Sequence, residues 1–239
     1  MKYIYGPVQS RRLGTSLGVS LTPYKMCDFD CIYCQLGETQ HTTIERKEHA
    51  SSQEIIEEVK SWFVNHPQEA ATLQFVTLSG LGEPTLHSAL GGIIAELKKI
   101  TTVNVAVITN ASLLADASVR QALLASDLIV PSLDAAEQTV FETINRPHQG
   151  IKIEEIIAGL QQLRRDYRGQ IWLEVMLVKG VNDSLTHARK LAEITEQIRP
   201  QKIQLNSPVR TTAHDNVLPV GRKRLEKIKE ILGEKCEII

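Results

Sequence analysis

Short apolar runs rich in β-branched residues alternate with longer segments of helical period along almost the whole chain, and this alternation constrains the fold most. Six runs predict strands, at 16–23, 73–80, 103–110, 127–134, 171–180 and 202–210. The segments that follow them predict helices over 51–66, 87–100, 116–126, 135–144 with 152–167, 183–198 and 220–232. Strands that alternate with helices pair in parallel through right-handed crossovers. The chain is therefore of the α/β class.

Six strand–helix units are two short of the closed eight-stranded barrel. We therefore predict a partial (β/α)6 TIM-like barrel with a parallel sheet, and the alternative is an open, doubly wound sheet. No linker, low-complexity tract or repeat interrupts the pattern. A chain of 239 residues, 42% of them hydrophobic, is long enough for one large core. We expect residues 1–239 to form a single domain.

The compartment and the partner class follow from what the sequence does not contain. No apolar run approaches the roughly 18 residues of a membrane span. Gly6 and Pro7 interrupt the N-terminus before a signal peptide can form. We expect a cytoplasmic protein whose thiols stay reduced. The formal net charge of −1 does not indicate a dedicated nucleic-acid-binding domain.

Three of the four cysteines, Cys27, Cys31 and Cys34, fall in the loop after the first predicted strand. The fourth, Cys236, lies close to the end of the chain. A cubane of four irons normally takes four thiolates. Three thiolates leave one iron with an open position, and an open position on a metal site implies a substrate or cofactor ligand. The spacing therefore predicts an iron–sulfur cluster with one vacant corner.

Other readings of the cysteines stay open at this point. A structural zinc site would need a fourth ligand, which Asp28, Asp30 or His41 could supply. A plain electron carrier of the ferredoxin type would need Cys236 as its fourth thiolate. A disulfide with one free thiol is disfavoured in a reducing compartment.

The spacing C-x3-C-x2-C, with Tyr33 before the last cysteine and "GEP" after the second predicted strand, resembles the radical S-adenosylmethionine (radical SAM) superfamily. The resemblance implies one [4Fe-4S] cluster on the three cysteines, whose unique iron binds S-adenosyl-L-methionine. It implies an enzyme that cleaves this cofactor reductively to a 5′-deoxyadenosyl radical, which abstracts hydrogen from a substrate. An electron donor such as ferredoxin or flavodoxin is then required.

The resemblance also implies which residues contact the cofactor. Gly82, Glu83 and Pro84 would receive the amino group of the methionine moiety, and Gly80 would let the backbone approach closely. Asp134 is placed either at the cofactor or as a cap of the next helix. Asn182 or Asp183 could likewise cap the helix that follows them. The expected cofactor contacts are Tyr33, Gly80, Gly82, Glu83, Pro84, Asn110, Ser132, Asp134 and, beside adenine, Val178.

Arginine-bearing segments are expected near the mouth of the site. Arg11 and Arg12 precede the first predicted strand, Arg146 lies in "INRPH", and Arg210 closes the last strand. Because arginine pairs bidentately with phosphate or carboxylate, we expect an anionic small-molecule or tRNA-nucleoside substrate. Surface charge is the alternative. The catalytic candidates are Lys25, Arg146, Lys179 and Arg210.

The segments "YGPV", "SRRLG", "SGLGEPTLH", "SLDA" and "INRPH" resemble the branch of the superfamily related to wyosine-synthesising tRNA enzymes. Those enzymes carry a second set of cysteines for a second cluster used with pyruvate, and this chain has none left for one. Two other classes remain as alternatives. One is a non-catalytic iron–sulfur electron-transfer or maturation protein, and the other is a zinc-stabilised RNA-binding module.

Overall fold

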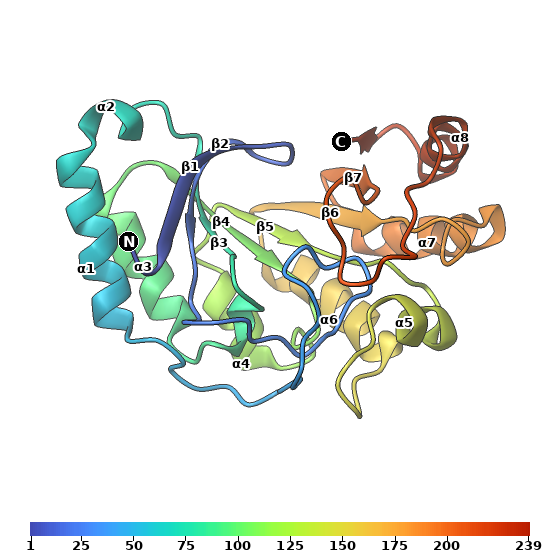
Figure 1. The fold of residues 1–239 in the computed structure, drawn as a ribbon, viewed down its shortest axis with the longest axis horizontal. Helices are drawn as coiled ribbons and strands as arrows, with labels where there is room; N and C mark the ends of the chain where they lie inside the picture. The colour runs from blue at the N-terminus through green and yellow to red at the C-terminus, as the bar shows by residue number, and fades with distance from the viewer.

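The structure is a computed structural model that describes residues 1–239. Its strands form one sheet in the order β1-β2-β3-β4-β5-β6-β7-β8 (Figure 1). The strands are β1 (Ile4–Ser10), β2 (Gly14–Val19), β3 (Phe75–Leu78), β4 (Asn104–Thr109), β5 (Leu128–Pro131), β6 (Gln170–Met176), β7 (Lys202–Asn206) and β8 (Cys236–Ile238). The helices are α1 (Ser52–Asn65), α2 (Pro67–Ala70), η1 (Pro84–Leu86), α3 (Leu90–Ile100), α4 (Ala117–Leu123), α5 (Gln138–Ile144), α6 (Ile153–Asp166), α7 (Leu185–Ile198) and α8 (Arg222–Leu232).

The six predicted strands correspond to β2–β7, and each pairs in parallel with its neighbour in sequence. A doubly wound sheet reverses its strand order at a switch point, and this sheet has none. The helices lie along the outer side of the curved sheet (Figure 1). The prediction of a partial barrel with a parallel sheet is therefore confirmed, and the doubly wound alternative is wrong.

Two strands lie outside the six that were predicted. β1 pairs antiparallel with β2, and its register shifts between Tyr5 and Val8. Gly6 and Pro7 fall inside that irregularity, and they hid the strand from a search for regular alternation. β8 pairs in parallel with β7 through only three residues, too few for a periodic signal.

The sheet separates two sets of apolar side chains. Side chains under the helices belong to one cluster of 50 buried residues that runs from Tyr3 to Cys236. On the inner face, Leu13, Ala106, Leu128 and Val130 form a small separate cluster. Alternation of side chains across each strand produces this division. None of the helices is both long enough and apolar enough to span a membrane.

Two helical glycines give a matched test of this packing. A Cβ on Gly159 of α6 would lie 2.7 Å from the backbone carbon of Leu114, whereas a Cβ on Gly92 of α3 would meet nothing within 4 Å. We expect Gly159→Ala to lower the free energy of unfolding by about 1–3 kcal/mol through overpacking. Gly92→Ala should raise it by about 0.5–1 kcal/mol, because alanine is the better helix former. Urea unfolding of both variants measures these changes, and equal effects of the two substitutions would contradict the packing described.

Candidate functional site

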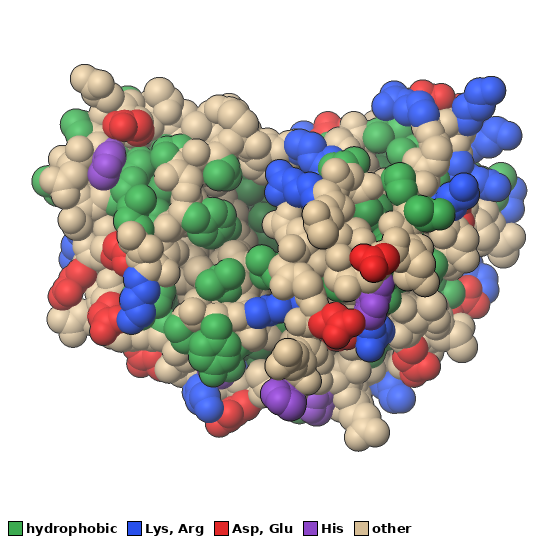
Figure 2. All heavy atoms as spheres, viewed as in Figure 1, with side chains coloured by type: hydrophobic (Ala, Val, Ile, Leu, Met, Phe, Trp, Pro, Cys, Tyr) green, Lys and Arg blue, Asp and Glu red, His purple; other side chains and the backbone are tan.

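A cavity of about 700 Å³ opens inside the curved sheet, between the cysteine loop and the turn that joins β1 to β2. Figure 2 shows this face of the molecule hollowed between its N-terminal and C-terminal halves. Eleven of the residues predicted from the sequence line the cavity: Lys25, Cys27, Cys31, Tyr33, Cys34, Gly80, Gly82, Glu83, Asn110, Ser132 and Arg210. The carboxyl ends of the parallel strands thus bring together groups far apart in sequence, as the fold requires.

Five predicted site residues do not line this cavity: Pro84, Asp134, Arg146, Val178 and Lys179. Val178 lies in the core, 1% exposed, so the expected contact with adenine does not fit its position. Lys179 is exposed. Arg146 pairs with Asp30, with 3.3 Å between Nη1 and Oδ2, and contacts His214. The lining of the cavity therefore does not support direct contact of these five residues with a bound ligand.

The cysteine loop is joined to the loop after β3 by two backbone hydrogen bonds. The Met26 N–H donates to the Leu81 carbonyl at 2.9 Å, and the Glu83 N–H donates to the Met26 carbonyl at 3.0 Å. A Cβ on Gly82 would lie 1.7 Å from that same Met26 oxygen. Only glycine permits this approach, so the "GEP" segment sets the position of the first cysteine.

Asp28 holds the next part of the loop from inside the protein. Its carboxylate accepts from Asn110 Nδ2 at 2.5 Å and from the Ser112 hydroxyl, both in the loop after β4. Its carbonyl accepts from the His148 N–H at 2.7 Å. Burial raises the pKa of the Asp28 carboxyl above its usual value, and the bonds from Ser112 and Asn110 oppose the shift.

Asparagine amides reach two of the three cysteine sulfurs. Asn110 Nδ2 lies 3.7 Å from Cys27 Sγ, and Asn145 Nδ2 lies 3.4 Å from Cys31 Sγ. The first amide is also bonded to Asp28, and the second donates to Asp134 Oδ2 at 2.8 Å. Hydrogen bonds to the sulfurs are among the features by which proteins set the potential of iron–sulfur clusters.

The donor set fits such a cluster. Cys27, Cys31 and Cys34 are free of disulfides, lie partly exposed at the cavity, and come from one loop. Burial raises the pKa of the Cys31 thiol to about 12, and it raises that of Cys27 well above its usual value. Binding of iron to these sulfurs must therefore displace protons.

A zinc site fits the residues less well. No three His, Cys, Asp or Glu side chains converge as the ligands of a single metal ion. Asp28 is bonded inside the protein, Asp30 accepts from the Thr39 N–H at 2.6 Å, and His41 is exposed. A cubane differs from zinc here because each thiolate binds a different iron. The residues around the cysteines therefore favour a cluster over a zinc ion.

Glu83 is 2% exposed and bonds to the protein on both carboxylate oxygens. One oxygen accepts from the Thr85 backbone and hydroxyl at 3.0 and 2.7 Å and from Thr109 Oγ1 at 2.6 Å, and the other accepts from the Asn110 N–H at 2.7 Å. Burial, and then the charge of Asp28, raise the pKa of Glu83 to about 7. Its carboxylate thus ties the loop after β3 to the end of β4.

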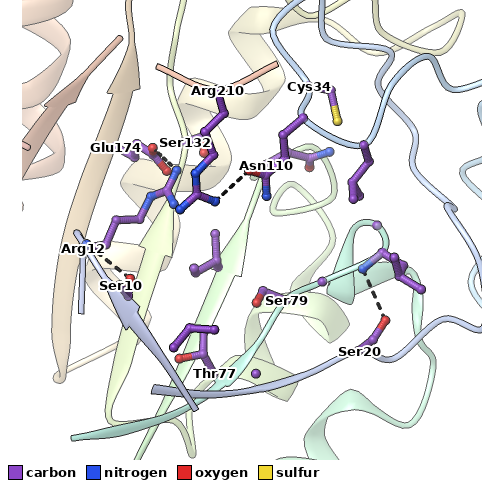
Figure 3. Close-up of a pocket in the computed structure, with 18 of the residues that line it drawn as sticks. Ser10, Arg12, Ser20, Cys34, Thr77, Ser79, Asn110, Ser132, Glu174 and Arg210 are labelled. Atoms are coloured by element: carbon purple, nitrogen blue, oxygen red, sulfur yellow. Dashed lines mark hydrogen bonds and ion pairs between the residues drawn. The ribbon is translucent and has the colours of Figure 1, made fainter. Parts of the chain in front are cut away.

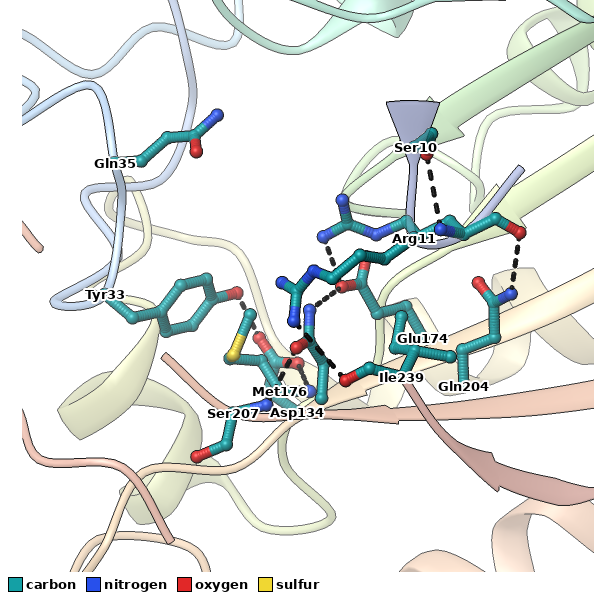
Figure 4. A network of polar contacts seen from close by, with 12 residues as sticks. Ser10, Arg11, Tyr33, Gln35, Asp134, Glu174, Met176, Gln204, Ser207 and Ile239 are labelled. Carbon is teal, nitrogen blue, oxygen red and sulfur yellow. Dashed lines mark hydrogen bonds and ion pairs between the residues drawn. The ribbon is translucent and has the colours of Figure 1, made fainter. Parts of the chain in front are cut away.

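Asp134 is not a helix cap, because α5 begins at Gln138. Its carboxylate accepts from the Tyr33 hydroxyl and from the Met176 N–H at 2.8 Å (Figure 4). It also accepts from Asn145 Nδ2. Asn182, also expected as a cap, donates to the Asp134 carbonyl at 2.8 Å, while Ser184 caps α7. Burial raises the pKa of Asp134 to about 6, against the lowering effect of these bonds.

Sequence reasoning missed the ion pair of Arg12 with Glu174, which lines the inner side of the cavity. Glu174 is 4% exposed and also accepts from Asn206 Nδ2 at 3.0 Å. A carboxylate in the middle of the apolar run "IWLEVMLV" was the available signal. A charge inside a barrel strand has to face a polar interior, because burying it unpaired is costly.

Comparisons with known proteins find relatives of this chain in sequence and in fold. Residues 21–192 match the family model of the radical SAM superfamily. A Brachyspira hyodysenteriae protein named GTPase Obg is 38% identical over 237 residues, 99% of this chain and 34% of that protein. A UPF0026 protein of Synechocystis is 38% identical over 244 residues, 98% of this chain and 89% of the relative. A structure of TYW1 with a lysine–pyruvate adduct bound has a TM-score of 0.67 at 20% identity, covering 92% of this chain and 74% of that one.

The fold is a partial barrel with a cavity at the carboxyl ends of its strands. The chain belongs to the radical SAM superfamily, whose enzymes use a [4Fe-4S] cluster and S-adenosylmethionine. It spans about a third of the Brachyspira relative's length. The likeness to TYW1 shows a shared fold.

The pKa of Asp134 predicts a pH dependence of stability. The folded protein keeps this proton up to about pH 6, whereas the carboxyl's ordinary pKa is 3.8. The folded state therefore binds more protons between these values, and stability falls as pH rises through them. Relative to Asp134→Asn, the cluster-free wild type should lose up to about 3 kcal/mol between about pH 4 and pH 7. Urea unfolding of both proteins tests this, and a difference that does not change with pH would contradict it.

Proposed function

We propose that Cys27, Cys31 and Cys34 hold the [4Fe-4S] cluster and that residues 1–239 form a single radical SAM domain. The observation that carries the proposal is three free thiols from one loop at the cavity, with the fourth cysteine elsewhere. Cys236 is 2% exposed in β8 and does not line the cavity. The bound cluster would supply the electron that cleaves S-adenosylmethionine and starts radical abstraction of hydrogen from the substrate.

The chain's own residues would position the cofactor around that cluster. Gly80 and Gly82 expose backbone at the cavity, and Gly82 holds the cysteine loop in place. Glu83 uses its side chain to fix the loop after β4, which leaves backbone groups of this segment for the methionine amino group. Ser132 and Asn110 lie at the same cavity, where they can contact polar parts of the cofactor.

Asp134 would act as a positioning residue. It holds the Tyr33 hydroxyl beside the cavity and the Asn145 amide beside Cys31. The contact with Tyr33 connects the loop after β5 to the cysteine loop directly, and the contact with Asn145 does so through the residue that follows α5. Asp134 would thus hold the cysteine loop in position without contacting the cofactor.

The partners follow from the chemistry of the family, whose enzymes act on substrates and take electrons from reductants. We propose a cytoplasmic protein that receives its electron from a donor such as ferredoxin or flavodoxin. The substrate is a small molecule or an RNA nucleoside that enters the cavity. The non-catalytic electron-transfer or maturation alternative has no support, because an electron carrier needs no cavity of about 700 Å³ beside its cluster.

The assignment of the ligands predicts separate outcomes for the four cysteines. After anaerobic reconstitution with iron and sulfide, wild type should bind one cluster and form 5′-deoxyadenosine with S-adenosylmethionine and dithionite. Cys27→Ala, Cys31→Ala and Cys34→Ala should each abolish product and lose most of the visible cluster absorbance. Cys236→Ala should keep both. Iron analysis and chromatography measure these outcomes, and a cluster that needs Cys236 would overturn the assignment.

The two asparagine amides predict a shift in cluster potential. Asn145→Ala removes the N–H donor 3.4 Å from Cys31 Sγ, and Asn110→Ala removes the donor 3.7 Å from Cys27 Sγ. These bonds stabilise the more negative, reduced cluster, so both variants should titrate at a lower potential than wild type. Asn65→Ala, on the exposed end of α1, is the control. A redox titration followed by EPR measures the shift, and unchanged potentials in both variants would contradict the role.

A further inference from the structure

We propose that the Arg11, Arg12 and Arg210 side of the cavity binds an anionic oxygen group of an organic substrate, either a phosphate or a carboxylate. The inference rests on the proposed function, since it names the substrate class of that same site. All three side chains line the cavity. Figure 3 shows Arg12 and Arg210 directed toward the same part of it, with Cys34 on another side.

Two parts of the chain far apart in sequence supply these arginines. Arg11 and Arg12 lie in the turn between β1 and β2, and Arg210 lies in the loop after β7. The three charges are close enough to affect one another. After burial, the positive charges of Arg12 and Arg210 lower the pKa of the Arg11 guanidinium. Like charges repel, so a protein that gathers them at a cavity gains from an anion between them.

Most of the N–H donors on these guanidinium groups have no partner in the protein. Each arginine has five such donors. Arg11 Nη1 donates at 3.3 Å to an oxygen of Ile239, the last residue of the sequence. Arg210 Nη1 donates to Gln35 Oε1 at 2.9 Å, and Arg12 Nη2 pairs with Glu174. No other side-chain bond from these three groups is present.

The inner arginine has a donor left over in a buried position. Arg12 Nε is shielded from solvent and has no hydrogen-bond partner. Glu174 is the one carboxylate side chain paired with any of the three arginines. One carboxylate side chain and a terminal oxygen of Ile239 therefore face three guanidinium groups, and an anionic ligand would satisfy the remaining charge and donors.

The opening suits an organic molecule more than an inorganic ion. Val8, Leu36 and Val209 are exposed and border the same cavity. Exposed apolar side chains grouped around a cavity are typical of a binding surface. A substrate with an apolar or aromatic part and one anionic group would contact both the rim and the arginines.

The test uses three probes of the same size class on the reconstituted protein: phenyl phosphate, benzoate and the neutral benzamide. By calorimetry, wild type should bind one anion at least tenfold more tightly than benzamide, and the preferred anion distinguishes phosphate from carboxylate. Arg11→Gln and Arg210→Gln should each weaken that anion about tenfold, as expected for loss of a charged hydrogen bond, and leave benzamide unchanged. Arg222→Gln, on exposed α8, should change nothing.

Several outcomes would overturn the inference. They are equal binding of anions and benzamide, equal anion binding by all three variants, or loss of S-adenosylmethionine affinity in Arg11→Gln and Arg210→Gln, which would assign the arginines to the cofactor. Arg12 is left intact because its removal would leave Glu174 buried without its cation.

The same measurement on cluster-free protein separates this inference from the proposed function. The arginines belong to the chain itself, so anion binding should persist when no cluster is present. Anion binding in a protein that forms no 5′-deoxyadenosine would contradict the proposed radical function and support the anion site. Formation of 5′-deoxyadenosine without any preference for anions would support the proposed function and contradict the anion site.

Discussion

The buried Asp28 carboxylate is the contact on which the shape of the site depends most. It lies inside the cysteine loop and accepts hydrogen bonds from Asn110 and Ser112, so the loop after β2 is fixed to the loop after β4. Burying a carboxylate is unfavourable unless donors surround it. Two such donors and the backbone of the loop satisfy this one. The first proposed cluster ligand, Cys27, is the residue directly before Asp28 in the chain, and its position follows from that of Asp28.

A second buried carboxylate repeats the arrangement on the other side of the loop. Asp134 holds Tyr33 and Asn145, and Asn145 in turn reaches Cys31. In both cases an acid positions an asparagine amide, and the amide faces a cysteine sulfur. Glu83 adds a third buried carboxylate, which accepts from the Asn110 N–H and so ties the loop after β3 to the loop after β4. The site is therefore held by bonds between neighbouring βα loops as well as by the sheet itself.

The sequence predicted what depends on periodicity and on motif spacing. It predicted six parallel strands and placed the cysteine loop and the glycines after β3 at the carboxyl ends of those strands. The structure brings eleven predicted residues to one cavity there. The predictions failed where the outcome depends on tertiary contacts. Asp134 was expected either at the cofactor or as a helix cap, but the helix begins at Gln138 and the carboxylate bonds across the barrel instead.

Val178 and Glu174 show the same limit of prediction from sequence. Both belong to an apolar run, and the sequence cannot say which residues face the core and which face the cavity without the curvature of the sheet. The structure places Val178 in the core and Glu174 against Arg12. β8 was missed because three residues give no period, although its pairing with β7 completes the sheet.

The most direct test of the account is an iron anomalous-scattering map of crystals of the anaerobically reconstituted protein. The account predicts one cubane per chain with three corners on the sulfurs of Cys27, Cys31 and Cys34, and no protein side chain on the fourth iron. A fourth protein ligand on the cluster, or a single metal ion in its place, would contradict it.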